Sequence, residues 1–268
     1  HQALGRRRET LREELRRGHA VDRRWLASLS SFAGRLRWRS HFMQKLEDEP
    51  ALEFENMNRV YDGMREGEFD QARFAAWCEG RTGYPMVDAC MRCLHTSGWI
   101  NFRMRAMLAS FAAYHLWLHW RPTSVFLARH FLDFEPGIHF PQFQMQSGVT
   151  GINTVRIYSP AKQVLDQDPE GVFLRRWLPE LAEVPREHLA EPQRMPLSVQ
   201  RDARCIIGEH YPPPIVDHAS AYQSARQRVY ARKRAARVES AAVYAKHGSR
   251  RRPGARGRKT RGTAQARE

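Results

Sequence analysis

The reactive side chains that stand out in this sequence are two arginines and two carboxylates. Arg103 and Arg105 lie in a segment that is apolar on nearly all sides, while Asp133 and Glu135 follow further along the chain. A guanidinium in such a segment needs an anion, because an unpaired buried charge costs several kcal/mol. Glu135 precedes a proline, which favours extended backbone and predicts that both carboxylates lie on a loop. The spacing alone favours a structural ion pair, and an Arg–Asp pair that lines a cofactor pocket is the alternative.

Tryptophans with arginines nearby recur along the chain. Such mixtures suit base stacking with phosphate contact, but long arginines that cover a tryptophan-rich core would produce the same pattern. The residues by themselves favour the second interpretation. The pairs are Arg37-Trp38-Arg39, Trp99 with Arg103, Trp117 and Trp120 with Arg121, and Arg175-Arg176-Trp177.

The four cysteines do not predict a metal site. Cys90 and Cys93 are spaced by one helical turn inside an apolar helical pattern, and no second pair with this spacing follows. Zinc and iron–sulfur sites need further ligands at a suitable spacing. We therefore interpret these thiols as small buried apolar groups, and so few cysteines in a long chain suggest a reducing cytoplasm.

The elements that position these residues are predicted to be helices. Apolar residues step by threes and fours over 25–36 and again over 102–120, where the segment is apolar nearly all round and is expected to form a buried helix. Gly83 and the proline two residues later should begin one helix, Gly98 should end it, and Pro122 should open another. No alternating strands and no βαβ pattern occur. The predicted fold class is all-α.

The positive charge of the chain is concentrated at its carboxyl end. From residue 224 onward there are 15 Lys and Arg residues and two acids, whereas the first 223 residues carry 29 basic and 27 acidic groups. We divide the chain into a helical domain over 1–218, a basic helix over 219–248 that should run to about Ala245, and a disordered Arg-rich tail over 249–268. Such a tail favours non-specific attraction to nucleic acid. No apolar run reaches the ~20 residues of a membrane span.

Several segments together resemble the helical FAD-binding half of the photolyase/cryptochrome family. Their order and spacing follow the family over residues 25–185, and linked motifs are far more specific than a single one. The matching segments are Arg37-Trp38-Arg39-Ser40-His41-Phe42, Gly83-Tyr84-Pro85-Met86-Val87-Asp88-Ala89-Cys90-Met91-Arg92, Ser97-Gly98-Trp99-Ile100-Asn101-Phe102-Arg103-Met104-Arg105, Trp120-Arg121 to Asp133-Phe134-Glu135, Arg156-Ile157-Tyr158-Ser159-Pro160-Ala161-Lys162-Gln163 and Phe173-Leu174-Arg175-Arg176-Trp177-Leu178-Pro179-Glu180-Leu181.

The resemblance implies a domain that holds FAD folded into a U at the bottom of a hole. Photolyases flip damaged DNA into that hole, and blue light drives an electron from reduced flavin to the pyrimidine dimer. Arg105 and Asp133 match the ion pair beside the flavin, and Glu135 matches the acid that accepts a hydrogen bond from the ring N3–H. The other positions implied to hold the cofactor are Trp38, Arg39 and Phe134.

The resemblance also implies roles in electron transfer and DNA binding. Trp120 matches the middle tryptophan of a photoreduction chain, and His139 stands where an asparagine or its substitute faces flavin N5. The positions implied to contact DNA are Arg35, Trp99, Arg103, Arg156 and Gln163. We expect a monomer without membrane contact, located in the cytoplasm of a bacterial-type cell and on the nucleoid when bound to DNA.

Departures from the family pattern weaken the case for ordinary cyclobutane-dimer repair. Phe143 and Met145 replace the tryptophans of a Trp-Gln-Trp motif, Arg35 stands where an acid is frequent, and Phe102 stands where asparagine is frequent. The antenna domain and the Ser/Thr-rich FAD phosphate-binding segment are not part of this sequence, which predicts either weak FAD binding or a truncated protein. The leading function is a light-dependent DNA lyase; the alternatives are a cryptochrome-like photosensor and a degenerate DNA-binding module.

Overall fold

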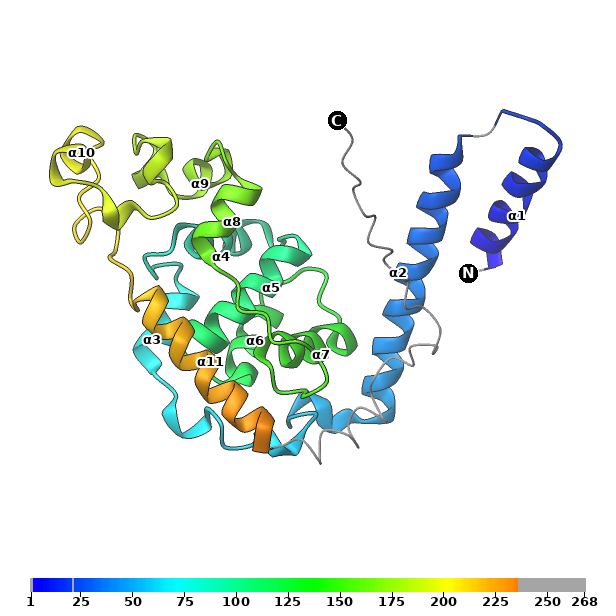
Figure 1. Cartoon of the computed structure of the whole chain (residues 1–268), viewed down its shortest axis with the longest axis horizontal. Helices are drawn as coiled ribbons and strands as arrows, with labels where there is room; N and C mark the ends of the chain where they lie inside the picture. The colour runs from blue at the N-terminus through cyan, green and yellow to red at the C-terminus, as the bar shows by residue number, and fades with distance from the viewer. Residues whose placement is uncertain (1, 21, 236–268) are drawn as a thin grey trace, which may run out of the picture.

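The regular elements of the chain are helices. The computed structural model describes residues 2–20 and 22–235, and β pairing in these ranges is limited to an isolated bridge between Ile207 and Tyr211 (Figure 1). The prediction of an all-α fold is confirmed. The α-helices are α1 (Gln2–Arg16), α2 (Arg23–Asp48), α3 (Gln71–Cys78), α4 (Pro85–Ser97), α5 (Phe102–Ser110), α6 (Trp120–Ala128), α7 (Pro136–Ser147), α8 (Pro160–Gln167), α9 (Val172–Trp177), α10 (Leu197–Asp202) and α11 (His218–Ala235).

Helix α4 forms the centre of the main core, and it packs against α3, α5, α8 and α9. Its limits are those predicted from the sequence. Gly83 adopts a φ of +75° just before the helix, and Gly98 ends it with a φ of +69° while donating its N–H to the Leu94 carbonyl over 2.8 Å. Cys90 and Cys93 are buried in this helix with free thiols, and the described residues contain no cluster that could hold a metal ion.

The single buried helix predicted over 102–120 is wrong. Helix α5 ends at Ser110 and continues as a π-helical turn over Phe111–His115, after which Trp117 has a φ of +56° and α6 begins anew. The guanidinium carbons of Arg65 and Arg228 lie 4.5 and 3.9 Å from the centre of the Trp117 ring. These tertiary contacts hold a backbone conformation that the local apolar pattern does not indicate.

Helices α2 and α7 approach each other closely at Gly137. A Cβ atom at Gly137 would lie 2.8 Å from the Cα atom of Met43, so only glycine allows this distance. The other half of α2 extends away from the helical body together with α1 (Figure 1). The helix predicted over 25–36 is confirmed, but Trp25 and Phe32 on it are 62% and 54% exposed.

Helix α11 packs against the π-helical turn that follows α5, where Ala225 and Val229 are buried. Arg228 pairs with Glu68, and the Arg232 guanidinium donates to the carbonyl of Val60 over 2.6 Å. The predicted start of this helix is confirmed, while its predicted end and the tail over 249–268 fall outside the described residues. In the part of the chain that the structure describes, no helix combines the length and apolar character of a membrane span.

Candidate functional site

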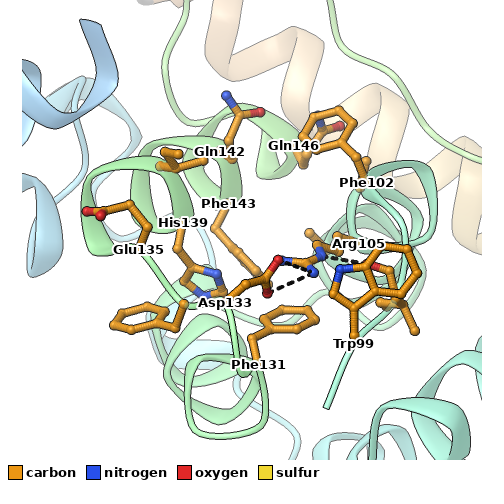
Figure 2. Close-up of a pocket in the computed structure, with 15 residues that line it drawn as sticks. Trp99, Phe102, Arg105, Phe131, Asp133, Glu135, His139, Gln142, Phe143 and Gln146 are labelled. Atoms are coloured by element: carbon orange, nitrogen blue, oxygen red, sulfur yellow. Dashed lines mark hydrogen bonds and ion pairs between the residues drawn. The ribbon is translucent and has the colours of Figure 1, made fainter. Parts of the chain in front are cut away.

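A cavity of about 340 Å³ opens between α5, α7 and the segment that joins α6 to α7. Most of its wall is apolar, and aromatic rings, one ion pair and several uncharged polar groups face it (Figure 2). This size and this composition are typical of a small-molecule site. The lining residues are Trp99, Ile100, Phe102, Arg105, Ala106, Ala109, Phe131, Asp133, Phe134, Glu135, Ile138, His139, Gln142, Phe143 and Gln146.

The ion pair in this wall joins α5 to the loop before α7. The Leu132 N–H donates to the Gly98 carbonyl over 3.0 Å, which draws the loop toward the start of α5. Nη2 of Arg105 then reaches both carboxylate oxygens of Asp133, at 2.9 and 3.0 Å, and Nε donates to the Ile100 carbonyl over 2.8 Å. Of the two partners that the sequence offered to Arg105, the structure selects Asp133.

The surroundings of the two arginines differ from the sequence-based expectation. The Arg105 side chain is 22% exposed and that of Asp133 is 51% exposed, so the pair is open to solvent on one side. Arg103 is exposed, and the prediction that both arginines are buried is wrong for this residue. Arg103 stands in the first turn of α5 next to the exposed Asn101 and Phe102, whereas the residues from Ala106 to Ser110 are buried nearly all round the helix.

Glu135 places a carboxylate at the start of α7. Its backbone is extended, with φ −136° and ψ 109°, as the following proline predicts. One side-chain oxygen caps the helix by accepting from the Gly137 N–H over 3.3 Å, and the other lies 3.8 Å from Nη2 of Arg39. Glu135 therefore presents hydrogen-bond acceptors at one end of the α7 wall.

His139 lies one turn further along α7 and turns its ring edge toward the cavity (Figure 2). Nε2 is 2.8 Å from the Ser124 carbonyl oxygen, which can only accept, so Nε2 carries the proton. Burial lowers the pKa of His139 to about 4, so the ring is neutral near pH 7. Nδ1 then has a lone pair and no hydrogen, and His139 can accept but not donate a hydrogen bond there.

Gln142 contributes a buried amide that the sequence-based reasoning missed. The residue is 7% exposed and lines the cavity, yet neither its Oε1 nor its Nε2 has a hydrogen-bond partner in the protein. A buried amide without partners is unfavourable unless a ligand or water supplies them. The spacing of Glu135, His139, Gln142 and Gln146 along one helix is the sequence signal that could have indicated this polar stripe.

Trp120 does not line the cavity. It is completely buried, and its indole N–H donates to Oδ1 of Asn56 over 2.7 Å. The ring of Phe140 contacts both Trp120 and the cavity residue His139. The centre of the Phe140 ring lies 6.5 Å from that of Trp120 and 5.5 Å from that of His139. An aromatic series thus connects Trp120 to the cavity through Phe140.

The remaining positions expected to bind FAD or DNA do not line the cavity, and they differ in exposure. Trp38 is 36% exposed and contacts Phe102 edge-on, with the ring centres 6.5 Å apart. Gln163, which was expected to contact DNA, is only 6% exposed and lies on α8, a helix that packs against α4. The expected DNA-contacting arginines, Arg35, Arg103 and Arg156, are exposed.

Together these features define a helical protein with a site for a flat heteroaromatic ligand. Residues 32–231 match the family described as the FAD binding domain of DNA photolyase. The chain belongs to the photolyase/cryptochrome family, and the part present here is its FAD-binding domain.

The relatives include repair enzymes and cryptochromes. The chain is 33% identical over 199 residues to a (6-4)DNA photolyase from Oryza sativa subsp. japonica, covering 74% of this chain and 36% of the relative. It is 39% identical over 150 residues to Cryptochrome-2 from Arabidopsis thaliana, covering 55% and 24%. The crystal structure of a bacterial class III photolyase from Agrobacterium tumefaciens superposes with a TM-score of 0.71 at 30% identity, covering 82% of this chain and 45% of that one. The chain spans less than half the length of these proteins.

The cavity residues fit FAD. The unpartnered amide of Gln142 and the acceptor at His139 need a ligand with polar ring atoms, and the apolar remainder of the wall suits a flat ring. Arg105, held by Asp133, adds a fixed positive charge beside that ring. Arg105, Asp133, Glu135, His139 and Gln142 are therefore the residues that would hold the flavin.

Proposed function

We propose that this chain is the FAD-binding part of a light-driven DNA-repair enzyme. The observation that carries the proposal is the aromatic mouth of the cavity, formed by Trp99, Phe102 and Phe134. These three side chains line the cavity and are nevertheless 54%, 56% and 39% exposed. Exposed aromatic faces around a hole are suited to stack on a base that has left the duplex.

The residues of the cavity would position the cofactor and the lesion. When bound, reduced FAD would supply the light-driven electron transfer that splits a pyrimidine dimer. Arg105 stabilises negative charge on the ring, because Asp133 and the Ile100 carbonyl fix its guanidinium beside the cavity. Glu135 and His139 would accept hydrogen bonds from N–H groups of the ring and would thereby orient it.

The exposed arginines would bind the DNA backbone around this mouth. Arg35, Arg103 and Arg156 provide cations for phosphate groups, and Trp38 extends the aromatic surface beyond Phe102. Phosphate contacts position the duplex without reading its sequence, whereas stacking selects the flipped base. A monomeric protein located in the cytoplasm stays a prediction, as does the part of the basic tail in DNA binding.

The test is repair by the full chain with FAD added and chemically reduced. An oligonucleotide with a single cyclobutane dimer, and a second one with a (6-4) photoproduct, are illuminated with blue light, and the repaired strands are separated by chromatography. We expect light-dependent recovery of one of the two and none in the dark. Trp99→Ala should weaken binding of the damaged strand by about 1–3 kcal/mol, the value of a lost base stack.

Leu132→Ala is the matched control, because Leu132 is 85% exposed beside the cavity but is not among the residues that line it. This variant should bind damaged DNA like the unaltered chain. Equal affinity for damaged and intact DNA, with light-driven reduction of the flavin but no repair, would refute the lyase proposal and favour a cryptochrome-like photosensor.

A further inference from the structure

Gln142 differs from the other buried glutamine of α7 in a way that local structure does not explain. Gln144, two residues further, is completely buried, and its amide is fully used. Its Oε1 accepts from the Met57 N–H over 2.6 Å, and its Nε2 donates to the carbonyls of Leu52 and Glu55 over 2.8 and 2.9 Å. Gln142 has no such partner on either amide atom, although the residue is only 7% exposed.

The surroundings of Gln142 limit what can satisfy its amide. Along α7, Ile138 and His139 lie one turn before Gln142, Phe143 follows it directly and Gln146 lies one turn later. None of these cavity residues carries a charge, since the His139 ring is neutral near pH 7. Phosphate and polyol groups need several donors or cations close together. A flat ring fits this part of the cavity better, because it offers a polar edge to the amide and apolar faces to its neighbours.

The other polar residues on this side of the cavity, Glu135 and His139, show which atom the ligand needs from Gln142. Glu135 and His139 offer acceptors, the latter because its Nε2 hydrogen is already donated to Ser124. The Nε2 group of Gln142 is a donor, and it lies one turn beyond His139. An isoalloxazine ring carries ring nitrogens and carbonyl oxygens, which are acceptors that neither Glu135 nor His139 can satisfy.

We propose that Gln142 recognises the isoalloxazine ring of the flavin by donating a hydrogen bond from its side-chain amide to a ring acceptor. The inference rests on FAD occupying this cavity, but it does not depend on whether the protein repairs DNA. It makes Gln142 a binding and positioning residue whose burial without a partner is a cost that the ligand removes.

The proposal predicts opposite effects of Gln142→Leu on the empty and the loaded chain. Leucine has a similar size and no polar atoms, so it removes the unpartnered amide and should raise the melting temperature of the empty chain by about 2–4 °C. The same variant should bind flavin about tenfold more weakly, because one hydrogen bond to the ring is lost. A purely structural residue would change both quantities in the same direction.

Binding is measured by calorimetry on the full chain with two probes, riboflavin and FAD. Both contain the isoalloxazine ring, so Gln142→Leu should weaken both by the same factor. Gln142→Glu, which replaces the donor with an acceptor, should weaken both as well. Gln167→Leu is the matched control, since Gln167 is an exposed glutamine at the end of α8 that does not line the cavity; its affinities should change less than about twofold.

Three results would overturn the proposal. Gln142→Leu could lower both the melting temperature and flavin affinity, which assigns the amide a structural role. It could weaken FAD but not riboflavin, which moves the contact to the nucleotide part of FAD. Failure of the unaltered chain to bind either probe would overturn it together with the assignment of the cavity, whereas a lack of repair with normal flavin binding would contradict only the proposed function.

Discussion

Replacing Arg105 with alanine removes three contacts whose contributions to the free energy of unfolding differ in origin. The guanidinium donates to the Ile100 carbonyl over 2.8 Å, pairs with Asp133 at 2.9 Å, and lies 4.0 Å from the centre of the Phe131 ring. Ile100 is 3% exposed, so its carbonyl loses a donor in a place where water has little access.

The magnitude follows from these surroundings. An orphaned buried carbonyl costs about 1–3 kcal/mol, a half-exposed ion pair contributes about 0.2–1 kcal/mol, and a cation over an aromatic ring at a partly exposed site contributes about 0.5–1 kcal/mol. We expect Arg105→Ala to lower the free energy of unfolding by about 2–4 kcal/mol. Because Asp133 is 51% exposed, Asp133→Asn should cost about 1 kcal/mol or less.

The assay is urea unfolding of the empty chain followed by circular dichroism. Arg103→Ala is the control, because Arg103 is on the same helix but exposed, and it should stay within about 0.5 kcal/mol of the unaltered chain. If Asp133→Asn cost as much as Arg105→Ala, the pair would behave as a buried one, for which a loss of about 3–5 kcal/mol is typical, and the reasoning from exposure would be refuted.

Three further predictions concern stability, pH and light. Gly83→Ala should lower the free energy of unfolding in urea by more than about 2 kcal/mol, because the new Cβ atom would lie 2.4 Å from the backbone of Pro213. Gly63 has the same φ of +75° but open space around it, so Gly63→Ala should cost only about 1 kcal/mol. Burial raises the pKa of Asp88 from 3.8 to about 6. The protonated carboxyl therefore contributes stability that is fully present below pH 3.8, the pKa in the unfolded chain, and that is lost as the pH rises through about 6. Asp88→Asn should remove this part of the pH dependence of the melting temperature. Trp120→Phe leaves Oδ1 of Asn56 without its donor, which should lower the free energy of unfolding by about 1–3 kcal/mol. The same variant should slow the light-driven reduction of added FAD, and equal photoreduction rates in the variant and the unaltered chain would contradict this prediction.

Local signals were sufficient to predict helices whose ends are marked by glycine or proline in the sequence. Helix α4 lies between Gly83 and Gly98, two glycines with positive φ, and both limits were predicted. The break near Trp117 was not, because the strained backbone there depends on Arg65 and Arg228, which come from distant parts of the chain. An apolar pattern reports burial, but it does not report where a helix must turn to let other elements pack.

The same distinction applies to the cavity. Charge balance in an apolar segment was enough to pair Arg105 with the Asp133 region, since a buried guanidinium needs an anion whatever the fold. Gln142 could not be identified that way, because an uncharged amide is common on helix surfaces and only the packing around it shows that it is buried. The burial of Gln163 likewise depends on tertiary packing, which its neighbours in the sequence do not indicate.

The contact at Gly137 has a consequence for the shape of the cavity entrance. Helix α2 carries Trp38 and Arg39 to that entrance, and Glu135, the residue that caps α7, lies on the facing side. These two helices come closest where the Met43 Cα atom lies 2.8 Å from the position that a Cβ atom of residue 137 would take. A larger residue at this point would act as a wedge between the helices and move the α2 side chains outward together. The width of the entrance thus depends on the absence of a side chain at Gly137, a residue that does not itself line the cavity.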